Sequence, residues 1–304
     1  MIYGGCRMFQ VFADSAANLP AVVAKEYGIQ IISFVNMVNG EPLVCFDPDL
    51  TPEQEREGGK KYYDAVRRGA EIKTSLISSG RFEEAFRPVL EAGEDVIYFS
   101  LSHGISGNFN SARLAVDDLL EEFPDRKIRI VDSLNASLAQ GILAIYAVEM
   151  RQKGEDIDTI ADRLQDWAHK MNGVFTVEDL KYISRTGRLS NRAAFVGNML
   201  DIKPLLKGSK DGVIVAFRKV RGRKRSLNEI VDLVVRNVVD PENQILGIAQ
   251  ADCYEESLYV MKKIQEKIKV RRFINTSYDY CTGSHVGPGA MALFFMGKDR
   301  ELDQ

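Results

Sequence analysis

The sequence has few of the residues that build metal, disulfide or nucleotide sites. Its four cysteines, Cys6, Cys45, Cys253 and Cys281, lie far apart without a C-x-x-C pair, and its three histidines are equally scattered. This spacing argues against a structural zinc site and against a disulfide framework. The chain also has no G-x-x-x-x-G-K-[ST] loop and no strand-linked G-x-G-x-x-G. We therefore expect no metal and no nucleotide or other cofactor.

The sequence also has no large excess of positive or negative charge, and it has no long apolar run. The formal net charge is −3, which offers no general electrostatic attraction to nucleic acid. No apolar run approaches the roughly 20 residues of a membrane span. The first ten residues, MIYGGCRMFQ, lack the apolar core of a signal peptide. We therefore expect a cytoplasmic protein without stable membrane insertion.

The first half of the chain alternates between apolar strands and amphipathic helices. Strands are predicted at 9–13, 29–35, 95–100 and 127–131, and helices at 20–27, 51–68, 79–92, 107–122, 137–153 and 157–170. Asn39-Gly40 predicts a hairpin, Thr51 to Gln54 predicts a capping box, and Lys73 to Ser75 is predicted to lie in a loop. This alternation predicts a parallel α/β layer.

The second half mixes hairpins with crossovers. Strands are predicted at 173–177, 202–206, 213–220, 244–249 and 273–280, helices at 177–184, 224–239 and 254–268, and a glycine-rich loop at 282–289. We expect an α+β domain with a mixed sheet. The predicted boundary is near residue 172, giving an N-terminal domain 1–172 and a C-terminal domain 173–304. No linker marks this boundary, so the two parts are expected to pack together.

The stretch from Phe99 to Ser111 predicts a buried strand, a tight turn and the start of a helix. Such a junction directs backbone N–H groups and hydroxyls toward one spot, which suits an anion. Ser106, the amide of Gly107 and Thr74 are candidate neutral donors to a carboxylate. From the residues alone, Ser106 is better explained as an ordinary helix cap, and Thr74 as an ordinary loop residue.

His285 is a candidate anion donor or general base, or a buried histidine with structural bonds only. A serine hydrolase would require a nucleophile turn such as G-x-S-x-G, and Gly104-Ile-Ser106-Gly107 does not match it. A hydrolase or phosphotransferase that uses Ser106 and His285 therefore stays the weaker alternative.

Two basic segments stand out. Arg185 and Arg188 could contact an anion or form structural ion pairs. The run from Arg218 to Arg225 could be a solvated loop, a phosphate site or a docking site for a partner. Its brevity and the acidic total argue against nucleic acid. A structural or regulatory protein that binds a partner through this run is a third possible function.

Eight short motifs occur together in one order along nearly the whole chain. They are ADS followed by LP (13–15, 19–20), KTS (73–75), ISGNFNSA (105–112), VDS (131–133), LKYISRTGRLS (180–190), IKPLL (202–206), KVRGRKRS (219–226) and GSHVGPGA (283–290). In this combination the sequence resembles the DegV family of bacterial fatty-acid-binding proteins.

The resemblance implies a two-domain DegV-like fold with a long-chain fatty acid buried between the domains. It implies that the carboxylate lies on Thr74 and Ser106 beside Gly107, with His285 and Arg185 close by. It also implies that the protein is not itself an enzyme. Instead it would present the fatty acid to a separate ATP-dependent fatty acid kinase, which makes an acyl phosphate, with Arg221 as the candidate docking residue.

The lining of such a tunnel is not evident from the residues. Phe195, Met199 and Phe295 are candidates, and core packing is the better explanation for each of them.

Overall fold

A parallel sheet forms the framework of the N-terminal half. The computed structural model describes residues 8–190 and 201–302. Its first sheet has the order β2-β1-β6-β7, with all neighbours parallel. The strands are β1 (Phe9–Asp14), β2 (Gln30–Ile32), β6 (Asp95–Ser100) and β7 (Ile128–Asp132). The predicted parallel layer is confirmed.

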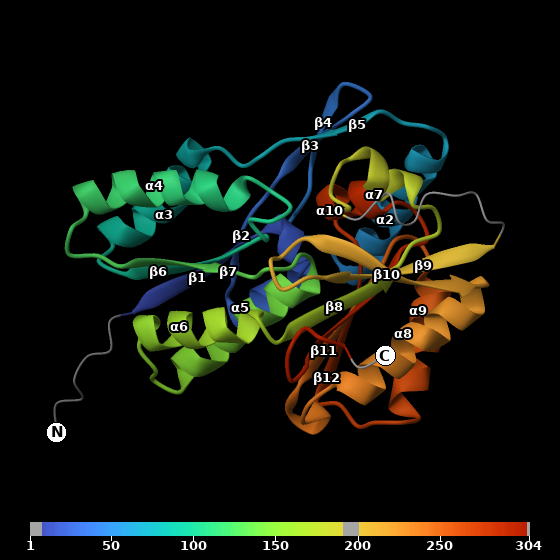
Figure 1. Cartoon of the computed structure of the whole chain (residues 1–304). Coiled ribbons are helices and arrows are strands. Elements are labelled where there is room, and N and C mark those ends of the chain that lie inside the picture. Colours follow the sequence, from blue (N-terminus) through green and yellow to red (C-terminus); the bar gives the residue numbers. More distant parts are fainter. Residues whose placement is uncertain (1–7, 191–200, 303–304) are drawn as a thin grey trace.

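Helices cover both faces of this sheet (Figure 1). Helices α3 (Ser79–Glu91) and α4 (Asn108–Glu122) pack on one face, and α5 (Leu138–Gln152) and α6 (Ile157–Ala168) on the other. In α3, the Ser78 hydroxyl caps the Arg81 N–H, and Phe82, Phe86 and Leu90 form the buried face. Because both faces are covered, every residue of β6 is buried, as its apolar sequence predicts.

The second half forms a mixed six-stranded sheet in the order β10-β9-β8-β13-β11-β12. Its neighbours are antiparallel except β11 and β12. The strands are β8 (Met171–Thr176), β9 (Ile202–Gly208), β10 (Ile214–Arg221), β11 (Ile245–Gln250), β12 (Arg272–Ser277) and β13 (Met291–Met296). Helices α8 (Arg223–Asn237) and α9 (Tyr254–Gln265) cover one face. The predicted mixed sheet is confirmed.

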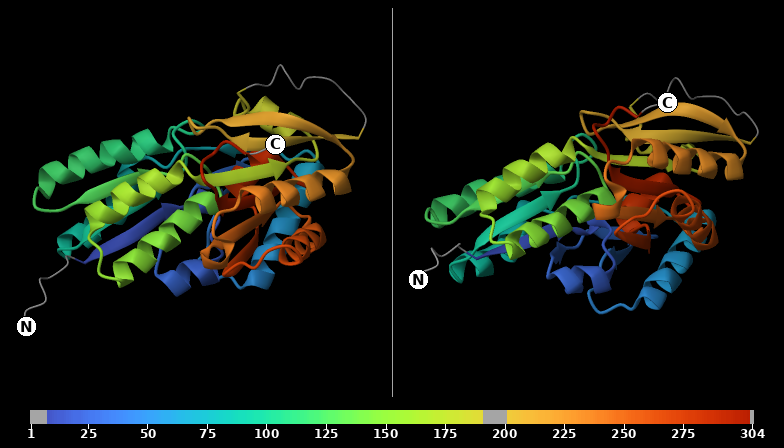
Figure 2. Two further views of the ribbon diagram at one scale, coloured as in Figure 1. Left: turned by 60° about the horizontal axis from the view of Figure 1, so that its bottom comes forward. Right: turned by 90° about the horizontal axis from the view of Figure 1, so that it is seen from below.

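Helix α5 lies between the two sheets (Figure 2). It contacts β1 and β6 of the parallel sheet and β8, β11 and β13 of the mixed sheet. Gly141 permits a close approach, since a Cβ there would lie 2.7 Å from the carbonyl oxygen of Ala17 in the short helix η1 (Ser15–Ala17) and 2.7 Å from Leu19 Cδ2. The two cores therefore share one helix, and the division at residue 172 stays a prediction.

Gly141→Ala is expected to destabilise the protein by about 1–3 kcal/mol, because the added methyl overlaps backbone and side-chain atoms that cannot both move. Gly80→Ala in α3 is the matched control. It meets no atom within 4 Å and should stabilise by roughly 0.5–1 kcal/mol through helix propensity. Urea unfolding of the two variants measures both effects. Equal stabilities would contradict the close approach of α5.

A small antiparallel sheet, β4-β3-β5, consists of β3 (Val35–Val38), β4 (Glu41–Val44) and β5 (Ile72–Thr74). Asn39 and Gly40 connect β3 to β4 with positive φ angles of 51° and 89°, which confirms the hairpin. The predicted loop at 73–75 is wrong for its first two residues, because β5 pairs with β3 and places Thr74 opposite Asn36. A three-residue strand has too little alternation to be recognised locally.

Helices α1 (Ala21–Tyr27) and α2 (Pro52–Arg67) follow the local signals of the sequence. The Thr51 hydroxyl accepts from the Gln54 N–H at 3.3 Å, and the Gln54 side chain accepts from the Thr51 N–H at 2.8 Å. The predicted capping box is therefore confirmed. Within residues 8–190 and 201–302, no helix combines the length and apolar character needed to cross a bilayer.

The glycine-rich segment is largely helical. A loop is predicted at 282–289, but helix α10 spans Tyr280–Val286 and ends at Gly287, whose φ is 77°. Half-buried Asp279 caps this helix by accepting from the N–H groups of Cys281 at 2.7 Å and Thr282 at 3.0 Å. A Cβ at Gly283 would lie 1.9 Å from Tyr63 Oη, so glycine serves close packing here rather than flexibility. Asp279 was the local signal for this helix.

Candidate ligand-binding site

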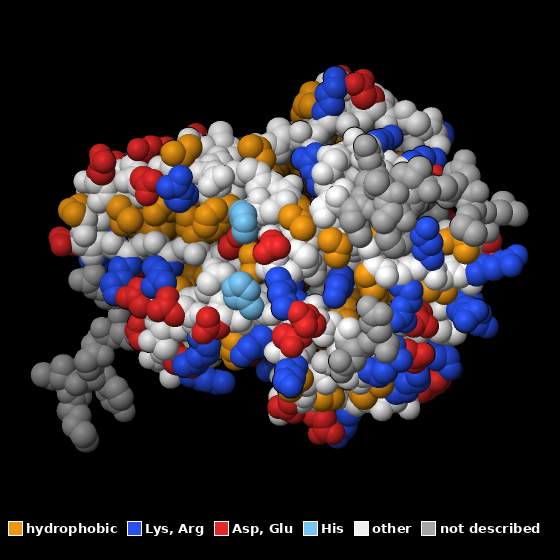
Figure 3. Space-filling view, in the orientation of Figure 1, with side chains coloured by type: hydrophobic (Ala, Val, Ile, Leu, Met, Phe, Trp, Pro, Cys, Tyr) orange, Lys and Arg blue, Asp and Glu red, His pale blue; other side chains and the backbone are white. Residues whose placement is uncertain are grey.

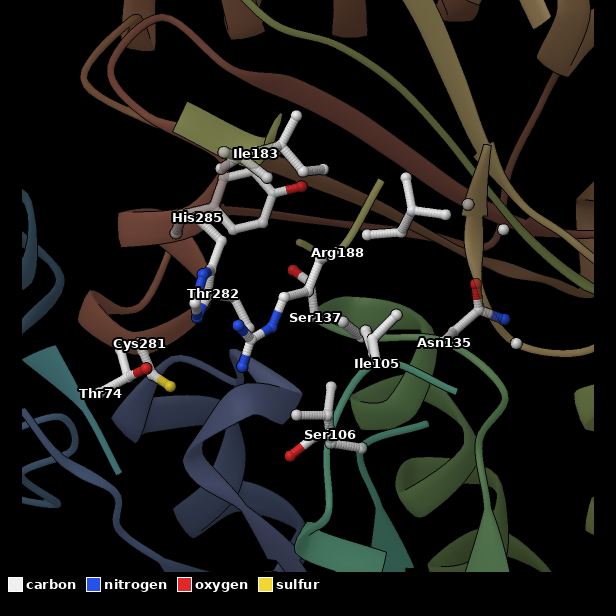
Figure 4. A pocket seen from close by; sticks show the side chains of 18 of the residues that line it. Thr74, Ile105, Ser106, Asn135, Ser137, Ile183, Arg188, Cys281, Thr282 and His285 are labelled. Atoms are coloured by element: carbon white, nitrogen blue, oxygen red, sulfur yellow. The ribbon is translucent and has the colours of Figure 1, made fainter. Parts of the chain in front are cut away.

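A cavity of about 200 Å³ lies where the parallel layer meets the mixed sheet. Most of its lining side chains are apolar, and they come from both halves of the chain: Phe34, Leu101, Ile105, Leu134, Phe175, Ile183, Ile214, Val286 and Phe294. The polar lining residues include Thr74, Ser106, Arg188, Thr282 and His285 (Figure 4). This combination suits a ligand with a long apolar part and a polar group.

Ser106 reaches the cavity from the turn between β6 and α4. Its hydroxyl accepts from the Asn108 N–H at 3.2 Å, so it also has the capping role that was considered as an alternative. Gly107 adjoins the cavity without lining it, and a Cβ there would lie 3.2 Å from Leu76 Cδ1.

Asp14, at the end of β1, stabilises this turn through buried hydrogen bonds. Its carboxylate accepts from Tyr98 Oη at 2.6 Å, from the Leu101 N–H at 3.2 Å and from Asn108 Nδ2 at 3.1 Å. Burial raises the pKa of this carboxyl, and these hydrogen bonds oppose the rise. Asp14 thus positions the turn that carries Ser106.

Thr74 lines the cavity from the last position of β5. Within the described part of the chain, its hydroxyl makes no hydrogen bond. The neighbouring Ser75 and Leu76 also line the cavity and are exposed, with Leu76 54% accessible. The end of the cavity near Thr74 is therefore next to the surface.

Helix α10 brings His285 and Thr282 to the cavity. Burial lowers the pKa of His285 to about 4, and the charges of Arg188 and Arg185 act in the same direction. The ring is therefore neutral at neutral pH. Its Nδ1 is buried without a hydrogen-bond partner in the described residues. Thr282 was not recognised from the sequence because the segment was not expected to be helical.

Arg188, rather than Arg185, lines the cavity. Helix α7 (Lys181–Arg185) ends at Arg185, whose guanidinium lies 5.1 Å from the centre of the Tyr182 ring. Figure 4 shows the Arg188 guanidinium in the space between Thr282 and Ser106. Arg188 therefore lies at the cavity, and the place of Arg185 close to a bound carboxylate stays a prediction. The R-x-x-R spacing marked both residues and could not decide which one faces inward.

The candidate tunnel residues have different locations. Phe295 is fully buried among the side chains between the mixed sheet and helices α8 and α9, so core packing accounts for it. Its neighbour Phe294 faces the cavity, because successive strand residues point to opposite faces. Phe195 and Met199 lie outside the described residues.

The basic run is divided between two elements. Arg218 to Arg221 belong to β10, and Arg223 to Arg225 begin α8. Gly222, with a φ of 90°, makes the sharp connection, so the run is not the solvated loop that was one of its three interpretations. Arg218 pairs with Glu229 and Arg223 with Glu256, whereas Arg221 is exposed. Figure 3 shows acidic side chains interspersed among the basic ones over this region.

The geometry of Ser106 and His285 does not resemble a nucleophile and base. No hydrogen bond joins their side chains in the described residues, and the Ser106 hydroxyl is engaged by the Asn108 amide. His103 does bond Asp132, but this pair lies outside the cavity. The cavity therefore offers neutral donors and one guanidinium to an anion, a set suited to binding.

The His285 ring is expected to titrate near pH 4 in ligand-free protein and at higher pH when a carboxylate is bound nearby. Because the folded pKa lies below the unfolded value, the stability contributed by neutral His285 is present above about pH 6.5 and is lost as the pH falls toward 4. NMR titration of the ring protons measures the midpoint, and His285→Asn assigns the signal. A midpoint near 6.5 without ligand would contradict this environment.

Known proteins are similar to this chain in sequence and in fold. The model of the family described as "Uncharacterised protein, DegV family" matches residues 8–298. A DegV domain-containing protein of Clostridium perfringens is 36% identical over 296 residues, covering 97% of this chain and 99% of the relative.

Two solved structures are similar over nearly their whole length. One is DegV, a fatty acid binding protein from Bacillus subtilis, with a TM-score of 0.80, 26% identity, and coverage of 96% of this chain and 100% of that chain. The other is a fatty acid binding DegV family protein from Streptococcus agalactiae, with a TM-score of 0.81, 25% identity and the same coverages. The sequence matches and the structural matches identify the same family, and the chain belongs to the DegV family.

Proposed function

We propose that this protein binds a long-chain fatty acid between an N-terminal and a C-terminal domain. The observation that carries the proposal is the cavity itself, whose lining is mostly apolar and whose polar side chains include Thr74, Ser106, Arg188 and His285. Each buried methylene of an acyl chain contributes roughly 0.8 kcal/mol, so an apolar cavity provides affinity while a few polar groups set orientation. The similar proteins that are described as fatty acid binding support the same ligand class.

The carboxylate is proposed to lie among Thr74, Ser106 and Arg188. The two hydroxyls are donors, and the guanidinium supplies the charge. Neutral His285 adds a donor without a second fixed charge, since its pKa is about 4. The amide of Gly107 lies one residue from Ser106 and could donate only from the edge of the site.

We further propose that the protein is a cytoplasmic carrier rather than an enzyme, and that it presents the carboxylate to a separate ATP-dependent fatty acid kinase. The exposure of Ser75 and Leu76 beside Thr74 supports access from outside at this end. Exposed Arg221 is the proposed docking residue.

Mass spectrometry of denatured protein purified from bacteria tests the binding function. A co-purified fatty acid is expected, together with saturable binding of palmitate or oleate to delipidated protein. Finding no lipid and no binding of either acid would overturn the proposal.

Arg221→Glu tests the docking role. Acyl-phosphate formation with the cognate kinase should fall, while fatty-acid affinity stays unchanged. Arg236→Glu is the control, because Arg236 is also an exposed arginine but lies in the last turn of α8. Equal rates for the two variants would remove Arg221 from the docking surface.

A further inference from the structure

The wall of the cavity on the side away from Thr74 contains a buried positive charge. Asn135, Gly173 and Gly208 line this part, and Figure 4 shows Asn135 on the opposite side of the cavity from Thr74. Behind them lies Arg300, which is 2% exposed. A Cβ at Gly208 would lie 2.1 Å from Arg300 Nη2. The guanidinium therefore packs directly against the backbone of Gly208, which lines the cavity.

Arg300 has hydrogen bonds but no anionic partner. Nη1 donates to the carbonyl oxygen of Leu134 at 2.9 Å, and Nη2 donates to Asn135 Oδ1 at 3.2 Å. Its Nε is buried without a partner, and no ion pair to it occurs in the described residues. Burial lowers the pKa of Arg300 to about 10, so the group remains a cation at neutral pH. The negative charge of Asp132 raises the pKa of Arg300 and so favours its protonated form.

This arrangement suits a hydrocarbon end poorly. Buried charges are normally paired, and buried polar groups normally have hydrogen-bond partners. A methyl group against Asn135 and Gly208 would leave the guanidinium with its two neutral acceptors and without an anion. The Asn135 amide already donates to the carbonyl oxygens of Ser133 at 3.3 Å and Met171 at 2.9 Å. An oxygen atom entering beside Gly208 would therefore be received by Arg300, and a carboxylate would also neutralise its charge.

We propose that the cavity accepts acyl chains that carry an oxygen function, a hydroxyl or a second carboxylate, at the end remote from Thr74, and that Arg300 receives this oxygen. The inference rests on the proposed fatty-acid binding and names the substrate class of the same cavity. It assigns Arg300, positioned by its hydrogen bond to Asn135 Oδ1, to ligand selection rather than to the carboxylate site at Thr74 and Ser106.

The test compares ligands of equal carbon number on delipidated wild-type protein. Dodecanoic, tetradecanoic and hexadecanoic acids are each measured against their terminal hydroxy derivatives and the corresponding dicarboxylic acids by calorimetry. At the chain length that fits best, the oxygenated acid is expected to bind about tenfold tighter, since a charged donor meets its terminal oxygen. In a cavity with an apolar end, the same oxygen would weaken binding by tenfold or more.

The outcomes separate the two proposals. Tighter binding of the dicarboxylic acid identifies a carboxylate as the preferred group, and tighter binding of the hydroxy acid alone identifies a hydroxyl. Weaker or equal binding of both at every length overturns this inference and leaves fatty-acid binding intact. If none of the acids binds, the proposed function itself fails.

Arg300→Met should abolish the preference for the oxygenated acid while retaining hexadecanoic acid binding. Arg87→Met is the matched control, because Arg87 lies in α3 and pairs with Glu122. If Arg300→Met does not fold, Arg300→Lys keeps the charge without the planar fork and should reduce the preference. An unchanged preference in a folded Arg300 variant would overturn the assignment, and the ligand comparison on wild-type protein stands without either variant.

Discussion

Arg188→Met is expected to weaken fatty-acid binding by about 10- to 100-fold, the largest affinity loss of any single substitution at the site. A hydrogen bond to a charged group contributes about 1.5–3 kcal/mol, and each 1.4 kcal/mol is tenfold in affinity. Arg188 is the guanidinium that lines the cavity beside Ser106 and Thr282. Titration of delipidated protein with palmitate measures the dissociation constant.

Arg185→Met is the matched control for this experiment. Arg185 belongs to the same basic turn but contacts the Tyr182 ring and does not line the cavity. Its removal should change affinity by less than about threefold, because only a long-range charge is lost. If Arg185→Met weakened binding more than Arg188→Met, the carboxylate would lie near Arg185, as the resemblance to the DegV family implies.

Asp14→Ala is expected to lower the free energy of unfolding by about 3 kcal/mol or more. The substitution leaves the Leu101 N–H, Tyr98 Oη and Asn108 Nδ2 without their common acceptor in a fully buried site. Each buried polar group left unpaired costs about 1–3 kcal/mol. Urea unfolding measures the loss. Palmitate affinity should also fall, because the turn that carries Ser106 loses its support.

Tyr98→Phe distinguishes the effect of losing one hydrogen bond to Asp14 from the effect of losing the whole network. It removes one donor to Asp14 and leaves the carboxylate with its backbone partners, so we expect a loss of only about 1 kcal/mol. Stabilities of Asp14→Ala and Tyr98→Phe that agree within error would show that Asp14 does not organise the turn.

Much of the fold was predictable because local signals agree with it. The apolar run at 95–100 is a strand buried on both faces, and Asn39-Gly40 connects a hairpin. The junction after Phe99 is a strand, a turn and a helix start, with Ser106 at the cavity. In each case a few neighbouring residues specify the backbone, through apolar periodicity or turn chemistry.

The predictions that were wrong concern segments in which tertiary packing outweighs the local preference of the residues for a loop. Gly283 and Gly287 suggested a loop, yet Gly283 lies within helix α10. Glycine is required there because a Cβ would overlap the Tyr63 hydroxyl. The segment at Thr74 became a strand because β3 offers a partner. Glycine and short strands are the cases in which intrinsic preference is weakest relative to tertiary contacts.

By itself, the sequence determined the parallel layer, the mixed sheet, the helix caps and the family, since these depend on neighbouring residues or on several motifs in order. Only the tertiary structure decided which groups face one another. The Ser102 hydroxyl donates to the Gly212 carbonyl at 2.8 Å, and Arg300 meets Asn135, although each pair is far apart in the chain. Side-chain direction at such contacts follows from the packing of both sheets on α5. The inward position of Arg188 and the buried charge at the remote wall are therefore properties of the folded chain.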